Sequence, residues 1–353
     1  MIINQLLPTI SYGDAVSNSA VNIMKILRDM GIKSSIYAQN IHPKMQKYAN
    51  HYKECPKKDP LIYHLSTGSE VVSELLTVRA KKIVYYHNIT PPHFFNGYSG
   101  VSRMLCEQGR NQLRELSDQF AFSLAASEYN RLELEQNGYK NTQVMPIIIN
   151  YEDYDQAPDN TVLNDSLQDG WVNLIFVGRI APNKKQEDVI KTFFYYKKYI
   201  NQKSRLILVG SYQGMERYYE ELLRLIKTLG LSDVYITGHL PFNQIIAYYK
   251  SADLFLSMSE HEGFGVPFVE AMKFDLPIIA FKSSAVGETI SNAGLLTLDK
   301  DYILTAELID YVLRDTHIQQ RLKFNRAERL NYYSKENTSL SFRKFIEQIV
   351  DRL

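Results

Sequence analysis

The chain has 353 residues, a length that corresponds to about two domains. Its 45% hydrophobic and 22% charged residues exclude a disordered polymer. Because 40 Lys and Arg residues balance 39 Asp and Glu residues, no overall field attracts nucleic acid, and we expect no nucleic-acid partner. The two cysteines, Cys55 and Cys106, have neither a metal-ligand nor a redox spacing, which favours a reducing cytosol.

The sequence also indicates that the chain does not insert into a membrane. The first ten residues lack the basic start of a signal peptide, and no apolar run approaches the roughly 18 residues that span a bilayer. We therefore expect a cytoplasmic protein. Peripheral contact with the inner membrane stays open, since residues 191–203 mix basic and aromatic side chains, although such stretches are more often amphipathic core helices.

In the first half, short apolar runs alternate with amphipathic stretches. A helix is predicted over 16–30, where apolar residues recur at i, i+3 and i+4 and Gly31 follows as a stop signal. Strands are predicted at 2–7, 34–37, 61–65, 83–86 and 120–125. This alternation predicts an α/β domain with a parallel sheet over residues 1–150.

Residues 151–170 contain many acidic residues and no Lys or Arg, which predicts a solvated linker. A second α/β domain is predicted over 171–336, followed by a C-terminal segment, 337–353. Its predicted strands are 172–177, 205–209, 234–237, 254–257 and 277–281, and its predicted helices are 187–199, 215–229, 242–251 and 267–274, with a last helix at 342–353. We expect two doubly wound, Rossmann-like domains that face each other across a ligand-binding cleft.

The strongest motif leaves the predicted strand 254–257 and enters a helix at Pro267. Glycines at such a turn let the backbone approach a ligand, and amides at a helix start attract hydroxyl and phosphate oxygens. The sequence therefore predicts a ligand-binding turn made of Gly263, Phe264, Gly265 and Val266.

Two glutamates flank this turn. Glu262 lies just before it and Glu270 one helical turn inside, so one carboxylate can face a hexose while the other accepts hydrogen bonds from a ribose diol. Two isolated acids would more often be solvated helix residues. The intervening Gly-Phe-Gly-Val-Pro favours the binding interpretation.

This glutamate pair resembles the motif of the family-4 retaining glycosyltransferases (glycosyl transferases group 1). Arg179 and Lys184, which follow an apolar strand and Gly178, resemble the cation pair of the same family. The resemblance implies a GT-B fold in which these cations stabilise the departing nucleoside diphosphate without a metal ion. The alternative, two exposed loop cations, is disfavoured by their position at a strand end.

In the first domain, Gly13 resembles the glycine of the family's loop near the diphosphate, and His87 resembles the histidine that approaches the donor sugar. A lone histidine is more often structural, but His87 lies at a strand end. No G-x-G-x-x-G motif and no P-loop lysine motif occur, which argues against dinucleotide oxidoreductases and P-loop enzymes.

Other expected contacts carry a weaker signal. His64 and Ser66 are expected on the acceptor side, although Ser66 alternatively caps a helix. His239 and Leu240 follow a strand at the place where the family receives the base through backbone groups. By the same resemblance, the C-terminal helix crosses back onto the first domain.

We therefore expect a retaining, metal-independent hexosyltransferase without a cofactor. Its donor would be GDP-mannose or a UDP-hexose, its acceptor a glycan or a lipid-linked saccharide, and its role bacterial surface polysaccharide biosynthesis, with mannosyl transfer the leading expectation. The expected catalytic residues are His87, Arg179, Lys184 and Glu262. A phosphorylase or epimerase of the same fold, or a non-catalytic sugar-binding protein, are the alternatives. Donor, acceptor, linkage and oligomeric state stay open.

Overall fold

The computed structural model describes residues 1–164 and 169–353 and divides into two compact units. Unit 1 comprises Met1–His93, Val101–Asn150 and Tyr332–Leu353. Unit 2 comprises Phe94–Gly100 and Tyr151–Asn331. Residues 165–168, which the sequence assigns to the acidic linker, lie outside the described residues.

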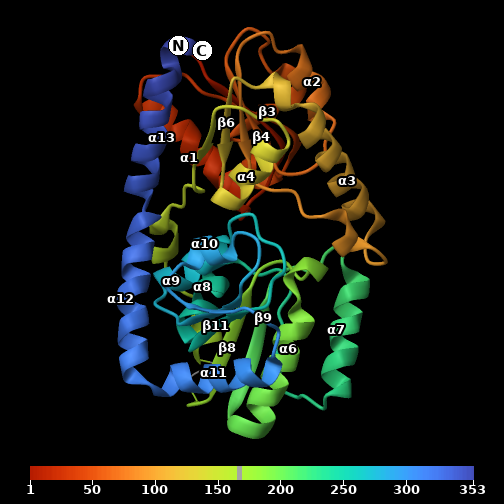
Figure 1. The fold of residues 1–353 in the computed structure, drawn as a ribbon, viewed down its shortest axis with the longest axis vertical. Coiled ribbons are helices and arrows are strands. Elements are labelled where there is room, and N and C mark those ends of the chain that lie inside the picture. The colour runs from red at the N-terminus through yellow and green to blue at the C-terminus, as the bar shows by residue number, and fades with distance from the viewer. Residues whose placement is uncertain (165–168) are drawn as a thin grey trace. The chain divides into compact units, whose positions relative to one another are not determined.

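Unit 1 contains a seven-stranded parallel sheet of order β3-β2-β1-β4-β5-β6-β7. Figure 1 labels β3, β4 and β6 of this sheet. Because the strand order runs outward in both directions from β1 and β4, the topology reverses between these two strands, which is where such sheets bind ligands. The strands are β1 (Asn4–Ile10), β2 (Ile36–Ile41), β3 (Ala49–His51), β4 (Leu61–Leu65), β5 (Lys82–Tyr86), β6 (Phe122–Ala125) and β7 (Thr142–Val144).

The predicted strand 61–65 is confirmed to the residue, whereas the ends of β1 and β2 were predicted wrongly. Both strands continue further than their apolar runs, β1 through Pro8 to Ile10 and β2 through Asn40 to Ile41. They do so because they pair with each other, with Thr9 opposite Asn40. Tertiary pairing overrides the local pattern here.

The helices of unit 1 are α1 (Ala15–Asp29), α2 (Val71–Thr77), α3 (Gly100–Glu115), α4 (Glu128–Gln136) and α13 (Lys335–Ile349). The predicted stop of α1 is confirmed: Gly31 has φ of +76°, and the amide of Ile32 donates to the carbonyl of Leu27 at 2.9 Å. The last helix begins at Lys335 rather than at 342, because the Ser334 hydroxyl caps its first turn.

Unit 2 contains a six-stranded parallel sheet of order β10-β9-β8-β11-β12-β13, so its topology reverses between β8 and β11. The strands are β8 (Val172–Val177), β9 (Ser204–Val209), β10 (Val234–Ile236), β11 (Leu254–Ser257), β12 (Ile278–Phe281) and β13 (Leu295–Thr297). The helices are α5 (Asn160–Asn164), α6 (Gln186–Tyr195), α7 (Glu216–Thr228), α8 (Phe242–Ser251), α9 (Val266–Lys273), α10 (Val286–Ile290), α11 (Tyr302–Arg314) and α12 (Thr316–Tyr332). Two α/β units with parallel sheets confirm the predicted fold class.

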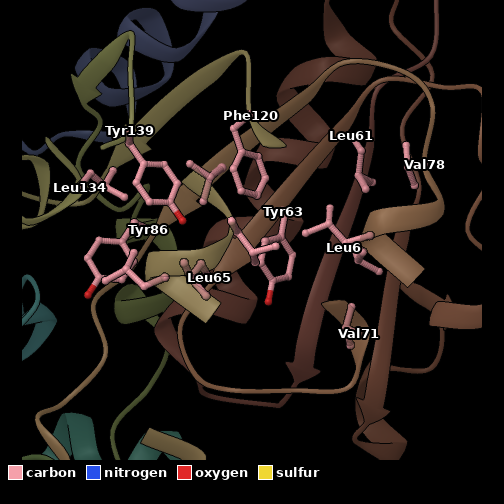
Figure 2. Packing of buried hydrophobic residues seen from close by; sticks show 14 of the residues in the cluster. Leu6, Leu61, Tyr63, Leu65, Val71, Val78, Tyr86, Phe120, Leu134 and Tyr139 are labelled. Atoms are coloured by element: carbon pink, nitrogen blue, oxygen red, sulfur yellow. The ribbon is translucent and has the colours of Figure 1, made fainter. Parts of the chain in front are cut away.

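Buried aromatic residues dominate the core on one face of the unit 1 sheet. Figure 2 shows Tyr63, Tyr86, Phe120 and Tyr139 among leucine and valine side chains. The rings of Tyr63 and Phe120 stack with centroids 6.2 Å apart. Since side chains alternate along a strand, the residues between Leu61, Tyr63 and Leu65 point to the opposite face, where the polar residues discussed below lie.

The basic and aromatic stretch 191–203 is largely helical but does not end as predicted. The regular helix α6 stops at Tyr195, and residues Tyr196–Ile200 form a π-helical turn in which Tyr196 is buried and Tyr199 is exposed. Across the described residues, no helix has both the length and the apolar character needed to cross a bilayer.

Candidate functional site

At the reversal point of the unit 1 sheet lies a pocket of about 380 Å³. Its lining residues come from the carboxyl ends of neighbouring strands β1, β4 and β5 and from the start of α1. They are Pro8, Thr9, Ser11, Asp14, Val16, Ser66, Thr67, His87 and Asn88. Two predicted site residues, Ser66 and His87, therefore line one pocket.

Gly13 lies in the turn between β1 and α1, beside this pocket. Its φ of +77° is one that side-chain-bearing residues rarely adopt, which explains the glycine. The next residue, Asp14, caps α1 by accepting hydrogen bonds from the amide of Ser17 at 2.9 Å and from its hydroxyl at 2.7 Å. The amide of Ser11 donates to that same hydroxyl at 2.9 Å, so the turn is fixed in place.

His64 lies one layer beneath the pocket and contacts His87 directly. Nδ1 of His64 is 2.9 Å from Nε2 of His87, and Nε2 of His64 is 2.9 Å from Oε1 of Gln5. Burial lowers the pKa of His64 to about 3, and burial together with the neighbouring ring of His64 lowers the pKa of His87 well below its ordinary value. Both rings are therefore neutral at physiological pH.

The loop after β4 is held by α3. Gly68 and Gly109 approach so closely that a Cβ atom on Gly68 would lie 2.6 Å from the backbone nitrogen of Gly109. The Gln112 side chain accepts from the amide of Ser69 and donates to its carbonyl, at 3.2 and 2.8 Å. The alternative role for Ser66 as a helix cap is wrong, since α2 begins five residues later, at Val71.

In unit 2, Arg179 lies at the carboxyl end of β8. There β8 and β9 approach at two glycines: a Cβ atom on Gly210 would lie 1.9 Å from the carbonyl oxygen of Gly178. Arg179 is exposed, and its Nη2 donates to the carbonyl of Gln213 at 3.2 Å. The end of β8 thus places a guanidinium group at the carboxyl edge of the sheet, beside the point where the strand order reverses between β8 and β11.

Lys184 and Glu262, expected in one site from the sequence, form an ion pair with each other. The Lys184 ammonium lies 2.6 Å from the Glu262 carboxylate. Asn183 brings their loops together, because its side chain donates to the carbonyl of His261 at 3.1 Å and its own carbonyl accepts from the amide of Glu260 at 2.9 Å. Residues 78 positions apart in the sequence are joined in this way.

The turn between β11 and α9 has the backbone form that its glycines suggest. Gly265 has φ of +89°, and a Cβ atom there would lie 2.5 Å from the Phe268 ring. Val266 begins α9, and the Phe264 side chain is buried in the protein, so that residue offers a ligand its backbone only. The amide of Glu262 donates to the hydroxyl of Ser284 at 2.7 Å.

Glu270, one turn inside α9, accepts hydrogen bonds from two tyrosines. Its Oε1 lies 2.7 Å from the hydroxyl of Tyr154, and its Oε2 lies 2.7 Å from the hydroxyl of Tyr249. Burial raises the pKa of Glu270, and the two hydroxyl donors oppose that shift. Each carboxylate oxygen retains a second lone pair, so the expected contact with a ribose diol is compatible with both tyrosines.

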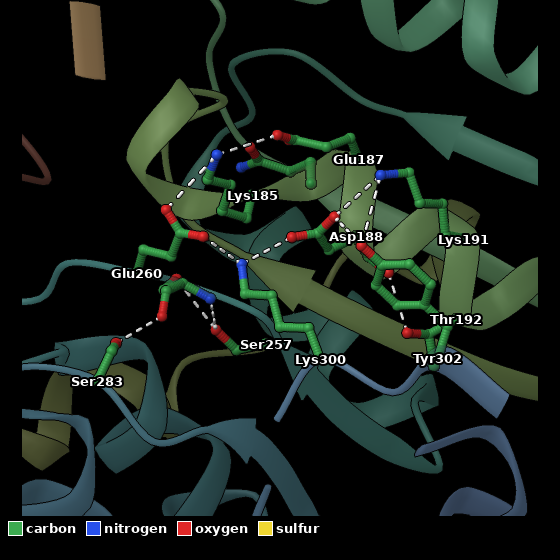
Figure 3. Close-up of polar contacts among 12 residues, drawn as sticks. Lys185, Glu187, Asp188, Lys191, Thr192, Ser257, Glu260, Ser283, Lys300 and Tyr302 are labelled. Atoms are coloured by element: carbon green, nitrogen blue, oxygen red, sulfur yellow. Dashed lines mark hydrogen bonds and ion pairs between the residues drawn. The ribbon is translucent and has the colours of Figure 1, made fainter. Parts of the chain in front are cut away.

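A network of ion pairs and hydrogen bonds holds the loop before this turn (Figure 3). Glu260 lies 2.6 Å from the Lys300 ammonium and 3.5 Å from that of Lys185. Lys300 also contacts Asp188 of α6 at 2.7 Å, and Asp188 accepts a hydrogen bond from the Tyr302 hydroxyl at 2.7 Å. This network therefore joins α6, the start of α11 and the loop that carries Glu262.

The expected base contacts follow β10. His239 is exposed, whereas Leu240 packs against the core of unit 2. Gly238, with φ of +72°, lies beside the ring of Tyr212, to which an added Cβ atom would come within 3.6 Å. An aromatic ring thus accompanies the backbone at this edge.

Sequence reasoning missed several residues that support these groups. Tyr154 lies in the stretch interpreted as a solvated acidic linker, yet it is buried against Glu270. Tyr249 and Gln5 are embedded in ordinary helix and strand patterns. No local motif marks any of them, because their partners are 21 to 116 residues away in the sequence.

Residues 167–336 match the model of the family described as glycosyl transferases group 1. Among curated proteins, the serotype-specific mannosyltransferase WbdA of Escherichia coli is 26% identical over 168 residues, which are 47% of this chain and 20% of that protein. The capsular polysaccharide biosynthesis glycosyltransferase CapM of Staphylococcus aureus is 26% identical over 50% of this chain and 44% of its own length. The chain thus spans less than half the length of these relatives.

Solved structures resemble the whole chain in fold. HepE of Anabaena, solved in complex with UDP and glucose, has a TM-score of 0.77 at 18% identity and covers 99% of this chain and 100% of that one. The sucrose-phosphate synthase of Thermosynechococcus elongatus has a TM-score of 0.74 at 16% identity, with 100% of both chains covered. These likenesses concern the fold alone. Residues 167–336, just under half of the chain, thus resemble the glycosyl transferases group 1, and the architecture of the chain is the GT-B fold.

Proposed function

We propose that the protein transfers a hexose from a nucleoside-diphosphate sugar to a glycan or lipid-linked acceptor, with retention at the anomeric carbon. The observation that carries this proposal is the gathering of Arg179, Lys184 and Glu262 at the reversal point of the unit 2 sheet, with Glu270 one turn further. Cations and carboxylates placed there match the needs of a diphosphate, a hexose and a ribose.

In this proposal the cations act on the leaving group. Cleavage of the bond from the anomeric carbon to the phosphate oxygen leaves negative charge on the diphosphate, and Arg179 and Lys184 stabilise that charge. The donor phosphate replaces Glu262 as a partner of Lys184, and the freed carboxylate accepts hydroxyl groups of the hexose. The leaving phosphate oxygen takes the acceptor proton on the same face as the attack, which gives retention.

Transfer in this scheme requires no metal ion and no cofactor, because the fixed cations supply the positive charge. Activity would then survive chelation by EDTA. Loss of activity in EDTA and its return with added Mg²⁺ or Mn²⁺ would contradict this part of the proposal.

The relatives suggest which donors to test first. WbdA and a second Escherichia coli relative, O-antigen chain mannosyltransferase B, which is 26% identical over 129 residues, are named as mannosyltransferases. HepE was solved with UDP-glucose. We therefore propose GDP-mannose as the leading donor and a UDP-hexose as the second, in the biosynthesis of a bacterial surface polysaccharide.

The test is thermal unfolding without metal in the presence of UDP-, GDP- and ADP-sugars. A ligand at 100 times its Kd stabilises the folded protein by about 2.7 kcal/mol. We expect one base to stabilise the wild type and Glu270→Ala and Arg179→Ala to abolish that gain. If no donor stabilises the folded protein, the transferase proposal fails and a non-catalytic sugar-binding role takes its place.

Product analysis separates the enzyme alternatives. A transferase releases the nucleoside diphosphate and forms a glycoside with the acceptor, whereas a phosphorylase needs free phosphate and an epimerase returns a nucleotide sugar. We expect retention of configuration at the transferred sugar, read by NMR of the product. An inverted anomeric centre would contradict the proposed chemistry.

A further inference from the structure

Three polar side chains lie on one face of the unit 1 sheet, opposite to the aromatic core. Gln5 comes from β1, His64 from β4 and His87 from the end of β5. The strand register places Gln5 beside Ile62 and His64 beside Tyr85, so each step from strand to strand advances two residues toward the carboxyl edge. Because side chains alternate along a strand, this spacing keeps all three on the same face.

The direction of the hydrogen bonds along this row follows from its first member. The Gln5 side-chain nitrogen donates to the carbonyl of Ala20 at 3.0 Å, so its oxygen Oε1 faces His64. The opposite amide orientation would set two oxygens against each other. Oε1 can only accept, and Nε2 of His64 therefore carries a proton.

The same logic fixes the second histidine. A neutral His64 with its proton on Nε2 has a lone pair on Nδ1, and that lone pair faces Nε2 of His87 at 2.9 Å. Nε2 of His87 must donate, so its Nδ1 carries no proton and is an acceptor. Protonation of His64 would set two N–H groups against each other, and protonation of His87 would turn its Nδ1 into a donor. Burial disfavours the cation in both rings.

The row ends at the pocket. His87 is 8% exposed and lines the pocket together with Ser66 and Thr67. Its Nδ1 is buried and has no hydrogen-bond partner among the described residues. A buried acceptor without a partner is rare in folded proteins and indicates that a donor from outside is missing.

We infer that Gln5 and His64 are positioning residues that hold His87 in its Nε2–H tautomer, so that Nδ1 accepts a hydrogen bond from a hydroxyl group of a ligand in the unit 1 pocket. This arrangement selects hydroxyl donors and disfavours phosphate or carboxylate oxygens at that nitrogen, since these only accept. That the hydroxyl belongs to a sugar rests on the proposed function. The tautomer does not.

The tautomer is measured by nitrogen NMR of the histidine rings in the full chain without ligand, at pH 7.5. We expect His64 and His87 to carry their protons on Nε2, with signals assigned by their loss in His64→Asn and His87→Gln. A proton on Nδ1 of His87, or a rapid mixture of tautomers, would overturn the inference.

Two substitutions of the same buried residue separate positioning from packing. The amide oxygen of His64→Asn can still accept from Nε2 of His87, whereas His64→Leu cannot. We expect His87 to keep its tautomer in His64→Asn and to lose it in His64→Leu. The affinity for the nucleotide sugar, relative to that for the bare diphosphate, should fall about fivefold to tenfold only in His64→Leu. Equal effects of both variants would overturn the positioning role. Gln5→Met breaks the row further from the pocket and serves if His64→Leu does not fold.

The ligand is tested by titrating UDP-glucose and GDP-mannose, each against its bare diphosphate. We expect one sugar, and neither UDP nor GDP, to move the Nδ1 resonance of His87 upfield, as a new hydrogen bond to that nitrogen requires. A sugar that stabilises the protein thermally but leaves this resonance unmoved overturns the acceptor role. If neither sugar stabilises the protein, the proposed function fails, while the ligand-free spectrum still decides the tautomer.

Discussion

The two sheets reverse their topology in the same way but carry opposite kinds of chemistry at that point. In unit 1 the row from Gln5 to His87 is neutral and ends in an acceptor that has no described partner. In unit 2 the groups are charged, and Lys184 and Glu262 bind each other. The two edges differ because a buried neutral acceptor without a partner costs less free energy than a partly buried charge without a counter-charge.

This difference predicts how each edge meets a ligand. The unit 1 pocket is preorganised, and a ligand adds a hydrogen bond without breaking one. In unit 2 an anionic ligand must compete with Glu262 for Lys184, and the exchange frees a carboxylate for hydroxyl groups.

Gly210→Ala disturbs the close approach of β8 and β9 in unit 2 and changes no charged side chain. The new methyl group would lie 1.9 Å from the carbonyl oxygen of Gly178, so β8 and β9 must separate. We expect a loss of at least about 4 kcal/mol in unfolding free energy, measured by urea denaturation. Gly100→Ala is the control, since it meets nothing within 4 Å at a helix start, and it should change stability by less than about 1 kcal/mol. Equal stability of the two variants would contradict the close approach.

Lys184→Met removes a cation from the same edge and leaves the fold in place. We expect the rate of transfer to fall about 10²- to 10³-fold, the size seen when one group that stabilises developing negative charge is lost. Lys197→Met is the matched control: its ammonium pairs with Asp233 at 2.8 Å, at the amino-terminal end of β10, and it should leave the rate unchanged. A Lys184→Met enzyme with the wild-type rate would remove Lys184 from the mechanism.

Tyr249→Phe removes one of the two hydroxyl donors to Glu270. The pKa of Glu270 is already raised by burial, and loss of the donor raises it further. At neutral pH the carboxylate must stay ionised at greater cost, so we expect a loss of about 1–3 kcal/mol. The loss should shrink as the pH falls toward 5 and the carboxyl group takes up a proton in the folded state.

The test for Tyr249→Phe is thermal unfolding between pH 5 and 8. Tyr235→Phe, on a tyrosine that is half exposed, serves as the control and should be neutral at every pH. A loss that is the same at pH 5 and pH 8 would show that packing, rather than the charge of Glu270, accounts for the effect.

Acid should destabilise unit 1 through its buried histidines. The folded pKa of His64, about 3, lies far below the unfolded value of about 6.5, so the unfolded chain binds more protons below pH 6.5. Stability from this group is complete above pH 6.5 and falls by about 1.4 kcal/mol for each pH unit below it.

Hydrogen exchange of amides in β4 and β5 between pH 4.5 and 7, corrected for the intrinsic exchange rate, measures this loss within unit 1. His64→Asn should reduce the slope by about one proton. A slope that does not change in His64→Asn would mean that His64 is already charged in the folded protein.

The sequence predicted that several candidate site residues lie at strand ends and turns. Gly13, Ser66 and His87, like Arg179 and Glu262, follow apolar runs, and parallel strands bring their carboxyl ends to one edge. Their partners could not be predicted. The pairing of Lys184 with Glu262 depends on the side chain and the carbonyl of Asn183, which join their two loops. The contact of Tyr154 with Glu270 depends on how a polar segment folds onto α9. Such contacts are set by tertiary packing, which leaves no periodic trace in a single sequence.

The ends of β1 and β2 show the same limit within the fold. Local composition ends β2 at Tyr37, yet pairing with β1 extends it to Ile41 through polar residues. Regular alternation of apolar residues predicted that the strands exist, and only the neighbouring strand determined their length.

The last helix has a consequence for the order in which the chain folds during synthesis. Phe342, Phe345 and Ile346 of α13 are buried, and the helix packs on α1 within unit 1. Roughly 180 residues of unit 2 are made between Asn150 and this helix, which at about 5–20 residues per second takes some 10 to 40 s. During that interval the emerging amino-terminal half exposes the apolar surface that α13 later covers. Unit 2 can complete its fold first, so the half that is made first is the last to be finished.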